Sequence, residues 1–351
     1  MVTLTRFRPR RANLAVIAGA LLAAAGCAAP GSTLESAPEV TVWSVGAPLS
    51  QPVWSYRTNS LVAVTDDHRL AEVSLGAHPD DAKARLSAPM EVGRNLQISR
   101  KDDRIVFVPQ PGRGRVAAVD LASLREVDDF DAGPTPAYLA EDAGMRILLA
   151  LSADGKSVTP VDQFGLRKLP TAGLADGPAD AIDGANRGRK IDYHAYGSSG
   201  IRYYEGFSSP PQDRGSLAMD VAVSAGDGAA DTRAYVAGHD SDVLYAVDSR
   251  RGGRGMEVLA STRLPSPIRE LGTDDTRIYA ATDREVVVLE TASFTGFADR
   301  RIPVIRVTDY RSALPAGAAA ARPSGMAIGP HRVYLTLAGV PCVVGVAKPR
   351  L

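Results

Sequence analysis

The chain contains very little cysteine: two residues, Cys27 and Cys342, among 351. So small a number excludes a scaffold held together by several disulfide bonds. Stability must therefore come from an ordinary apolar core, which a chain of this length is able to bury. Cys342 lies within an apolar run, Val340–Val344, and we expect a buried, unreactive thiol there.

The sequence also has no excess of charge of either sign. It carries 40 Lys and Arg residues against 40 Asp and Glu residues. A protein that binds nucleic acid needs a basic surface, and so does a protein held to anionic lipid head groups. The balance therefore predicts no nucleic-acid partner and no electrostatic attachment to a membrane.

Histidine, which commonly carries catalysis or binds metals, is scarce, and the usual catalytic motifs are missing. The five histidines are scattered, and no two of them form an H-x-H or H-x-x-x-H pair. The sequence has neither a G-x-S-x-G nucleophile motif nor a Gly-rich phosphate loop of a known type. The acidic pairs Asp102-Asp103 and Asp274-Asp275 precede equivalent strands, as structural turns do. We therefore expect no catalytic residues, no metal site and no cofactor.

No apolar run is long enough to span a membrane, but a short one lies near the N-terminus. This run, Leu14–Ala25, falls well below the roughly 20 residues that cross a bilayer. Four arginines precede it, which is the order of a secretory signal. Ala24-Ala25-Gly26-Cys27 resembles the bacterial lipobox, in which the cysteine is lipidated and becomes the new N-terminus. We predict a signal peptide over residues 1–26, a lipid such as palmitate on Cys27 and a flexible tether over residues 27–38.

The same segment predicts where the protein resides. An exported lipoprotein of this kind would be anchored through Cys27 to the outer face of the cytoplasmic membrane. Removal of residues 1–26 leaves 36 basic residues against 40 acidic ones, a net charge of −4. Two alternatives stay open. One is a plain signal peptide with an incidental cysteine, and the other is export by the twin-arginine route through Arg10-Arg11 instead of the general secretory route.

The rest of the chain, residues 39–351, contains a repeat. Short apolar runs begin after an arginine, and each is followed by a second run that ends at an acidic residue. The separations are 16, 16, 15 and 13 residues for Arg104 to Asp120, Arg146 to Asp162, Arg233 to Asp248 and Arg277 to Glu290. The runs are rich in Val, Ile and Tyr and bounded by Gly, Asp and Pro, which is typical of β-strands. An all-β repeat of about 42–44 residues predicts the four-stranded blades of a β-propeller.

Seven units fit the chain, although an irregular fourth unit leaves six or eight blades open. The units cover Pro52–Val92, Gly93–Ala132, Gly133–Leu174, Ala175–Gly215, Ser216–Leu264, Pro265–Ala316 and Gly317–Val346. The last unit ends after its third strand, whereas Val40–Val45 precedes the first unit without a partner. We therefore predict that this N-terminal strand becomes the outer strand of the last blade and closes the ring.

Two units preserve the repeat best. They contain Arg233-Ala-Tyr-Val-Ala-Gly followed by Val243-Leu-Tyr-Ala-Val-Asp, and Arg277-Ile-Tyr-Ala-Ala-Thr followed by Val286-Val-Val-Leu-Glu. With these motifs the chain resembles bacterial seven-bladed propellers of the YVTN-repeat kind, some of which are exported and lipid-anchored. The resemblance covers most of residues 50–346. It implies a fold and no particular activity, because the motif encodes blade geometry.

One segment, residues 183–215, interrupts the repeat and holds four of the eleven tyrosines together with several basic residues. Tyrosine and arginine are favoured at binding surfaces, so we predict a candidate binding surface there. Its residues are Arg189, Tyr193, His194, Arg202, Tyr203 and Tyr204. The alternative interpretation is an ordinary, degenerate blade whose tyrosines sit in the sheet.

These features favour a non-catalytic, lipid-anchored scaffold of the cell envelope that binds a protein partner or a ligand. Two alternatives remain. One is a propeller enzyme, either a hydrolase or lactonase with a central divalent metal or a quinoprotein-like oxidoreductase. The other is an extracytoplasmic metallochaperone. The sequence names neither the ligand nor the partner.

Overall fold

The computed structural model describes residues 38–174, 177–185, 187–207, 210–249, 255–274 and 276–349. The predicted signal peptide, Cys27 and the predicted tether as far as residue 37 lie outside these described residues. Regular structure is almost entirely β, with a single short α-helix in the described ranges, α1 (Ala292–Thr295). Short 3-10 turns lie at Pro79–Asp81, Pro111–Arg113, Ala298–Arg300, Arg311–Ala313 and Ala316–Ala318.

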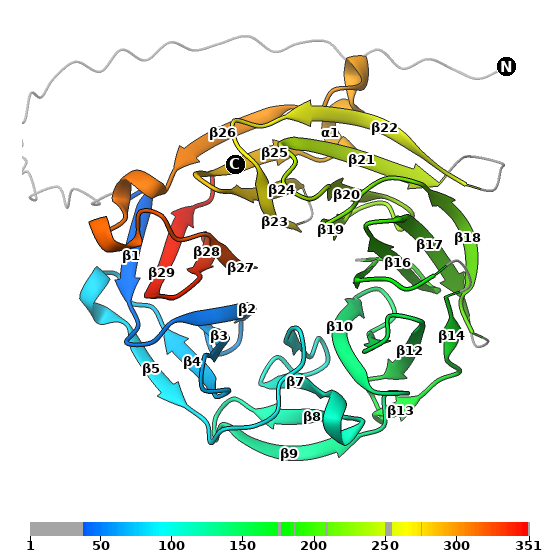
Figure 1. The fold of residues 1–351 in the computed structure, drawn as a ribbon, viewed down its shortest axis with the longest axis horizontal. Coiled ribbons are helices and arrows are strands. Elements are labelled where there is room, and N and C mark those ends of the chain that lie inside the picture. Colours follow the sequence, from blue (N-terminus) through cyan, green and yellow to red (C-terminus); the bar gives the residue numbers. More distant parts are fainter. Residues whose placement is uncertain are drawn as a thin grey trace, which may run out of the picture. The chain divides into compact units, whose positions relative to one another are not determined.

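The strands form seven antiparallel sheets around a central axis, which confirms the predicted seven-bladed β-propeller and excludes six or eight blades (Figure 1). In each sheet, or blade, the first strand lies nearest the axis. Blades 1 to 3 consist of β2 (Leu49–Ser55), β3 (Ser60–Thr65), β4 (Leu70–Ser74) and β5 (Lys83–Leu86); β6 (Gln97–Ile98), β7 (Ile105–Gln110), β8 (Arg115–Asp120) and β9 (Arg125–Phe130); and β10 (Pro136–Asp142), β11 (Ile147–Ser152), β12 (Ser157–Asp162), β13 (Arg167–Lys168) and β14 (Ala172–Gly173).

Blades 4 to 7 follow the same order around the ring. They consist of β15 (Ala181–Gly184), β16 (Ile191–Gly197), β17 (Gly200–Gly206) and β18 (Gln212–Leu217); β19 (Val223–Gly226), β20 (Ala234–Ala237), β21 (Val243–Ser249) and β22 (Met256–Arg263); β23 (Ile268–Thr273), β24 (Arg277–Thr282), β25 (Glu285–Glu290) and β26 (Val304–Asp309); and β27 (Pro323–Ile328), β28 (Arg332–Leu337), β29 (Val340–Ala347) and β1 (Val40–Ser44). Blade 4 is a regular four-stranded sheet, although the sequence predicted it to be the least regular unit.

The ring is closed by the N-terminal strand, as the sequence predicted. β1 pairs with β29 in an antiparallel ladder that runs from Val40 opposite Val346 to Ser44 opposite Cys342. The two ends of the described chain are therefore joined in one sheet. The Cys342 side chain is buried in this blade as a free thiol, in agreement with the prediction.

The hairpin of the second and third strands explains the arginine-to-acid spacing. In an antiparallel hairpin the start of one strand lies beside the end of the other. Arg277 is directly opposite Glu290, and Arg233 forms an ion pair with Asp248 at 2.9 Å. The spacing thus measures two strands and the turn between them, which is why it varies so little along the chain.

The core lies between blades instead of inside any one of them. Val62 and Val64 of blade 1, for example, pack with Val106 and Val108 of blade 2 in one buried cluster. A single sheet cannot cover both of its own faces, so each blade depends on its two neighbours for burial. This arrangement fixes the first strands around the axis and so builds the walls of a central channel.

Candidate functional site

A cavity of about 970 Å³ occupies the central channel, and all seven blades contribute to its wall. Its lining includes residues of β2, β6, β15, β19, β23 and β27, together with Ala143 just after β10. The volume lies in the range of pockets that enclose small molecules. The channel is therefore the candidate functional site.

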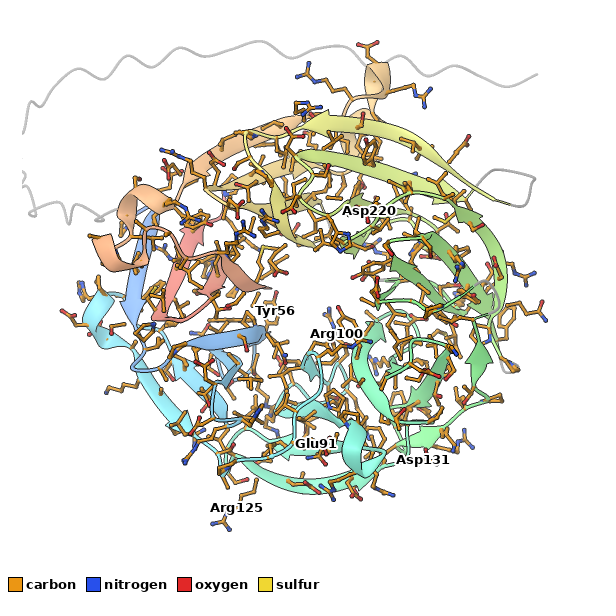
Figure 2. The ribbon with its side chains drawn as sticks, viewed as in Figure 1. Tyr56, Glu91, Arg100, Arg125, Asp131 and Asp220 are labelled. Carbon is orange, nitrogen blue, oxygen red and sulfur yellow. The ribbon has the colours of Figure 1, made fainter. Side chains whose placement is uncertain are left out.

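The channel opens at a mouth formed by Tyr56, Arg100, Asp103, Asp274 and Thr276, which we call the Tyr56 mouth. Each of these residues follows the first strand of its blade. The first strands all run in the same direction along the axis, so the turns after them gather at one end of the channel. Figure 2 shows Tyr56 and Arg100 beside the central opening, whereas Arg125 lies at the outer edge of the ring.

Aromatic and charged groups are exposed at this mouth. The Tyr56 side chain is 56% exposed, and its hydroxyl donates a hydrogen bond to the backbone oxygen of Ile328 at 3.0 Å. Arg100 Nε lies 3.3 Å from Glu141 Oε2, which ties the mouth to blade 3. Burial raises the pKa of Glu141, and the charge of Arg100 opposes that rise. Two residues of the mouth are thus tied to other blades: Tyr56 to blade 7 and Arg100 to blade 3.

Asp102 and Asp274, the first residues of the two acidic pairs noted in the sequence, stabilise the turns before β7 and β24. Asp102 holds Arg104 through an ion pair at 2.9 Å, and the Asp274 carboxylate accepts hydrogen bonds from the backbone N–H groups of Thr276 and Arg277. The same turns also place Asp103 and Asp274 on the channel wall. Sequence reasoning missed this second role, because a structural turn and a channel carboxylate carry the same sequence signal.

Asp183 is the carboxylate that lies further inside, on β15. Its carboxylate accepts a hydrogen bond from the Ser224 hydroxyl at 3.3 Å, across the boundary between blades 4 and 5. Burial raises the pKa of Asp183 to about 7. Glu270 on β23 is held in a similar environment, and burial raises its pKa to about 7 as well. The interior of the ring therefore contains carboxyl groups that are costly to ionise.

The six residues of the predicted binding surface do not form one exposed surface. Arg189 is exposed in the turn before β16. The other five are buried within blade 4: Tyr193, His194, Arg202, Tyr203 and Tyr204. The reason is that β16 and β17 are the middle strands of the blade, and neighbouring blades cover both of their faces. The alternative interpretation, in which the tyrosines sit in the sheet, describes this structure.

These buried side chains hold blade 4 together. Tyr193 and Tyr204 stack with ring centroids 5.0 Å apart, and the Tyr203 hydroxyl donates to Asp192 at 3.0 Å. His194 contacts the backbone oxygen of Thr232 in blade 5 through Nε2 at 3.3 Å, and Arg202 donates to Gly177 O at 3.0 Å. One member of the wider segment does reach the channel: Asp183, which lies opposite His194 in the β15–β16 ladder.

Among the described residues, no group of three or more His, Cys, Asp or Glu side chains is arranged to hold a metal ion. Within the same ranges, no helix combines the length and the apolar character needed to cross a bilayer.

Stability should fall as the pH rises from about 5.5 to 8. Burial raises the pKa of Asp142 to about 7 and that of Asp192 to about 6, in addition to Asp183 and Glu270. In the unfolded chain such groups titrate near pH 4. Between about pH 4 and 7 the folded protein therefore binds more protons than the unfolded chain, and the free energy of unfolding falls as the pH rises through this range. Buried His194 has the opposite effect on stability, because burial lowers its pKa to about 4. The unfolded chain therefore takes up this proton more readily than the folded one, and His194 destabilises the protein as the pH falls below about 6.5. Four carboxyls outweigh one imidazole.

Scanning calorimetry of the wild type and of Glu270→Gln checks this prediction. The amide is neutral at every pH, so the variant should unfold about 1–2 °C higher than the wild type at pH 8, the shift expected for about 1 kcal/mol in a domain of about 310 residues. At about pH 5.5 the two midpoints should nearly coincide. A wild-type midpoint that rises steadily from pH 5.5 to 8 would contradict the prediction.

Comparison with protein-family models and with curated proteins gives no match. Solved structures do match the chain at low identity. It is similar to a chain in the crystal structure of the mitotic checkpoint complex (12% identity, TM-score 0.65, covering 96% of this chain and 100% of that one), to U3-55K (9%, 0.64, 88% and 98%) and to the WD40 repeats of RRP9 (10%, 0.61, 88% and 97%). At these identities the likeness shows the fold alone, a seven-bladed propeller with WD40-like neighbours.

Proposed function

We propose that the protein is a non-catalytic lipoprotein, exported to the outer face of the cytoplasmic membrane, whose propeller binds a protein partner or a ligand at the Tyr56 mouth. The observation that carries the binding role is the cavity of about 970 Å³, which opens at a mouth with an exposed tyrosine and an arginine. Tyrosine and arginine are the residues most favoured at the centres of interfaces. Concave sites of this size on a rigid scaffold commonly take ligands or protruding segments.

The ring geometry suits such a role physically. Neighbouring blades bury each other's faces, and the two ends of the described chain are joined through β1 and β29. The turns that form the Tyr56 mouth follow the first strands of blades 1, 2 and 6. Because these blades are packed into the closed ring, little conformational entropy is lost when a partner docks. One of the similar solved structures is itself part of an assembly, the mitotic checkpoint complex, which supports a scaffold role by analogy of fold.

The envelope location rests on the sequence alone. Four arginines, a short apolar run and Ala24-Ala25-Gly26-Cys27 support export and lipid attachment. Anchoring at the N-terminus would leave the whole propeller outside the cytoplasm, where the Tyr56 mouth could meet an envelope partner.

The lipid anchor is tested by metabolic labelling with a palmitate analogue, followed by membrane fractionation. The wild type should incorporate the label and sediment with membranes, whereas Cys27→Ala should lose the label and leave the membrane fraction. Cys342→Ala is the matched control, because Cys342 is the second cysteine and its thiol is buried in blade 7. Equal labelling of the wild type and Cys27→Ala would reject lipid attachment at Cys27.

The binding face is tested by photo-crosslinking in intact cells. A crosslinking amino acid at position 56 should capture a discrete partner, because this side chain is 56% exposed at the channel mouth. The same amino acid at position 127, where Val127 is 59% exposed on outer strand β9, is the matched control and should capture far less. Equal or stronger capture at position 127 would move the binding surface away from the mouth. Stoichiometric divalent metal in the purified protein would favour the hydrolase or metallochaperone alternative instead.

A further inference from the structure

The channel wall carries carboxylates that the protein's own cations do not neutralise. Arg100 is already paired with Glu141 at 3.3 Å, and Lys348 Nζ lies 3.1 Å from Asp274 Oδ2. Within the described part of the chain, no ion pair connects a cation to either of the remaining wall carboxylates, which are Asp103 and Asp183. The channel wall therefore contains two acidic groups to which the described residues supply no cationic partner.

Among the described residues, the hydrogen-bond donors to Asp183 are neutral. It accepts hydrogen bonds from the Ser224 hydroxyl and from the backbone N–H of Gly226. The carboxyl is deep among protein atoms, yet its residue keeps part of its surface open and lines the cavity. A carboxylate in such a place is stabilised far more by an arriving cation than an exposed carboxylate would be, because water does not screen the pair.

Asp103 at the mouth has an acceptor that the fold leaves unused. One oxygen, Oδ2, accepts the backbone N–H of Arg57 at 3.0 Å. The other, Oδ1, is buried and has no hydrogen-bond partner among the described residues. Buried polar atoms without partners are uncommon in native structures, and one on the wall of an open cavity indicates a group that a ligand can satisfy.

The rest of the wall is suited to an aliphatic chain. Trp54, Leu271, Met326 and Ile328 line the cavity between the polar positions. A ligand with a methylene stem and a charged end, such as a lysine side chain or a polyamine, would bury its stem against these residues. An inorganic cation would gain nothing from them.

We propose that the channel binds an organic cation, an ammonium or guanidinium group on an aliphatic stem, which enters through the Tyr56 mouth and pairs with Asp183, with Asp103 as a second contact nearer the mouth. This inference rests on the proposed function and specifies the chemistry of its ligand. The cation can come from a free polyamine or from a Lys or Arg side chain of a protein partner, and the two sources are separated by the choice of probe.

The binding test uses isothermal titration calorimetry of the purified protein with three probes. They are spermidine, a capped pentapeptide with a central lysine, and the same peptide with acetyl-lysine. We expect at least one cationic probe to bind and acetyl-lysine to bind at least about 10-fold more weakly. Asp183→Asn should weaken cation binding about 10-fold or more, and Asp103→Asn should weaken it less. Asp128→Asn, which removes the same charge from exposed outer strand β9, is the matched control and should change nothing.

Proton release on binding tests whether Asp183 contacts the cation, because no proton would be released if Asp183 had only a structural role. Burial raises the pKa of Asp183 to about 7, so a bound cation should expel a proton near pH 6.5, measurable by titration in buffers of different ionisation enthalpy. The Ser224 hydroxyl and the Gly226 amide donate to Asp183, and the hydroxyls of Tyr138 and Tyr196 face it at longer range. Glu270 acts on the same two tyrosines and burial raises its pKa to about 7 as well, so Glu270→Gln, which should keep the release, is the control that assigns the proton to Asp183. Asp183→Asn should abolish the release.

The inference is overturned if neither cationic probe binds the wild type at millimolar concentration, if acetyl-lysine binds as well as lysine, or if Asp183→Asn binds like the wild type. Binding of spermidine but not of the peptide would assign the site to free polyamines, and the reverse would assign it to a partner's side chain. Photo-crosslinking at position 56 separates failure of the cation site from failure of the proposed partner binding at the Tyr56 mouth. Partner capture that persists when cation binding fails would leave the proposed function standing and remove only this inference.

Discussion

Starting the chain at Ala47 instead of Pro38 will lower the thermal unfolding midpoint by more than about 10 °C or prevent folding. The deletion removes β1 and with it the whole five-residue ladder on β29. Blade 7 then loses its outer strand, and the link that makes the ring a single closed object is lost. Loss of a buried tryptophan alone costs about 3–5 kcal/mol, and each kcal/mol lowers the midpoint by about 1.5 °C in a domain of about 310 residues. Loss of the backbone ladder and of the remaining β1 packing adds to this.

Trp43 explains why β1 contributes so much. Its side chain is 2% exposed, and its indole N–H donates to the backbone oxygen of Gly76 at 3.1 Å, which ties blade 7 to blade 1. The guanidinium of Arg332 lies over the ring at 5.7 Å. A side chain at Gly345 would meet the indole at 2.5 Å, so the glycine leaves the space that the ring fills.

Calorimetry or circular dichroism of two chains, one beginning at Pro38 and one at Ala47, provides the comparison. The chain beginning at Pro38 keeps β1 and should unfold close to the full-length protein. Trp43→Ala should fall between the two, because it removes the packing and leaves the backbone ladder. A chain beginning at Ala47 that unfolds at the same temperature as the other would show that ring closure contributes nothing to stability.

Replacing Gly184 by alanine should destabilise the protein by about 1–3 kcal/mol or more, although the change adds only one methyl group. The new Cβ would lie 2.1 Å from Glu141 O and 2.8 Å from Asp142 N. Both atoms belong to the backbone of β10, so no side-chain rotation relieves the contact. The first strands of blades 3 and 4 would have to move apart at the narrowest part of the ring.

Gly173→Ala is the matched control for this substitution. Gly173 also lies in a strand, β14, but a Cβ added there meets no atom within 4 Å. Neither glycine has a positive φ, so backbone strain does not distinguish them. Thermal melts should therefore show a loss of about 2–5 °C or more for Gly184→Ala and almost none for Gly173→Ala. Equal midpoints for the two variants would be evidence against the close approach of blades 3 and 4.

The backbone displacement caused by Gly184→Ala should also affect the Tyr56 mouth. Glu141 holds Arg100 of the Tyr56 mouth at 3.3 Å, and its backbone is the part that alanine would displace. The variant therefore links inter-blade packing to the geometry of the mouth.

The tyrosines of blade 4 illustrate what sequence reasoning could not resolve. Tyr193 and Tyr204 lie in strands whose residues are buried on both faces, because neighbouring blades cover each side. Such strands lack the polar alternation that would mark an exposed face. Richness in tyrosine and arginine therefore looks the same for a binding surface and for a packed sheet, and only the positions of the adjacent blades separate the two.

The sequence by itself predicted the propeller architecture: the strands, a repeat that fits seven units, the buried Cys342 and the closing role of Val40–Val45, whereas the structure excluded six or eight blades. Each of these follows from local patterns that recur every 40 or so residues, or from a strand left over at one end. Only the tertiary structure decided the site. Asp103, Asp183 and Tyr56 come from three different blades, and no short-range pattern relates them. Closing the ring brings them to one axis, because each blade contributes only its innermost strand and the following turn to a channel that none of them forms alone.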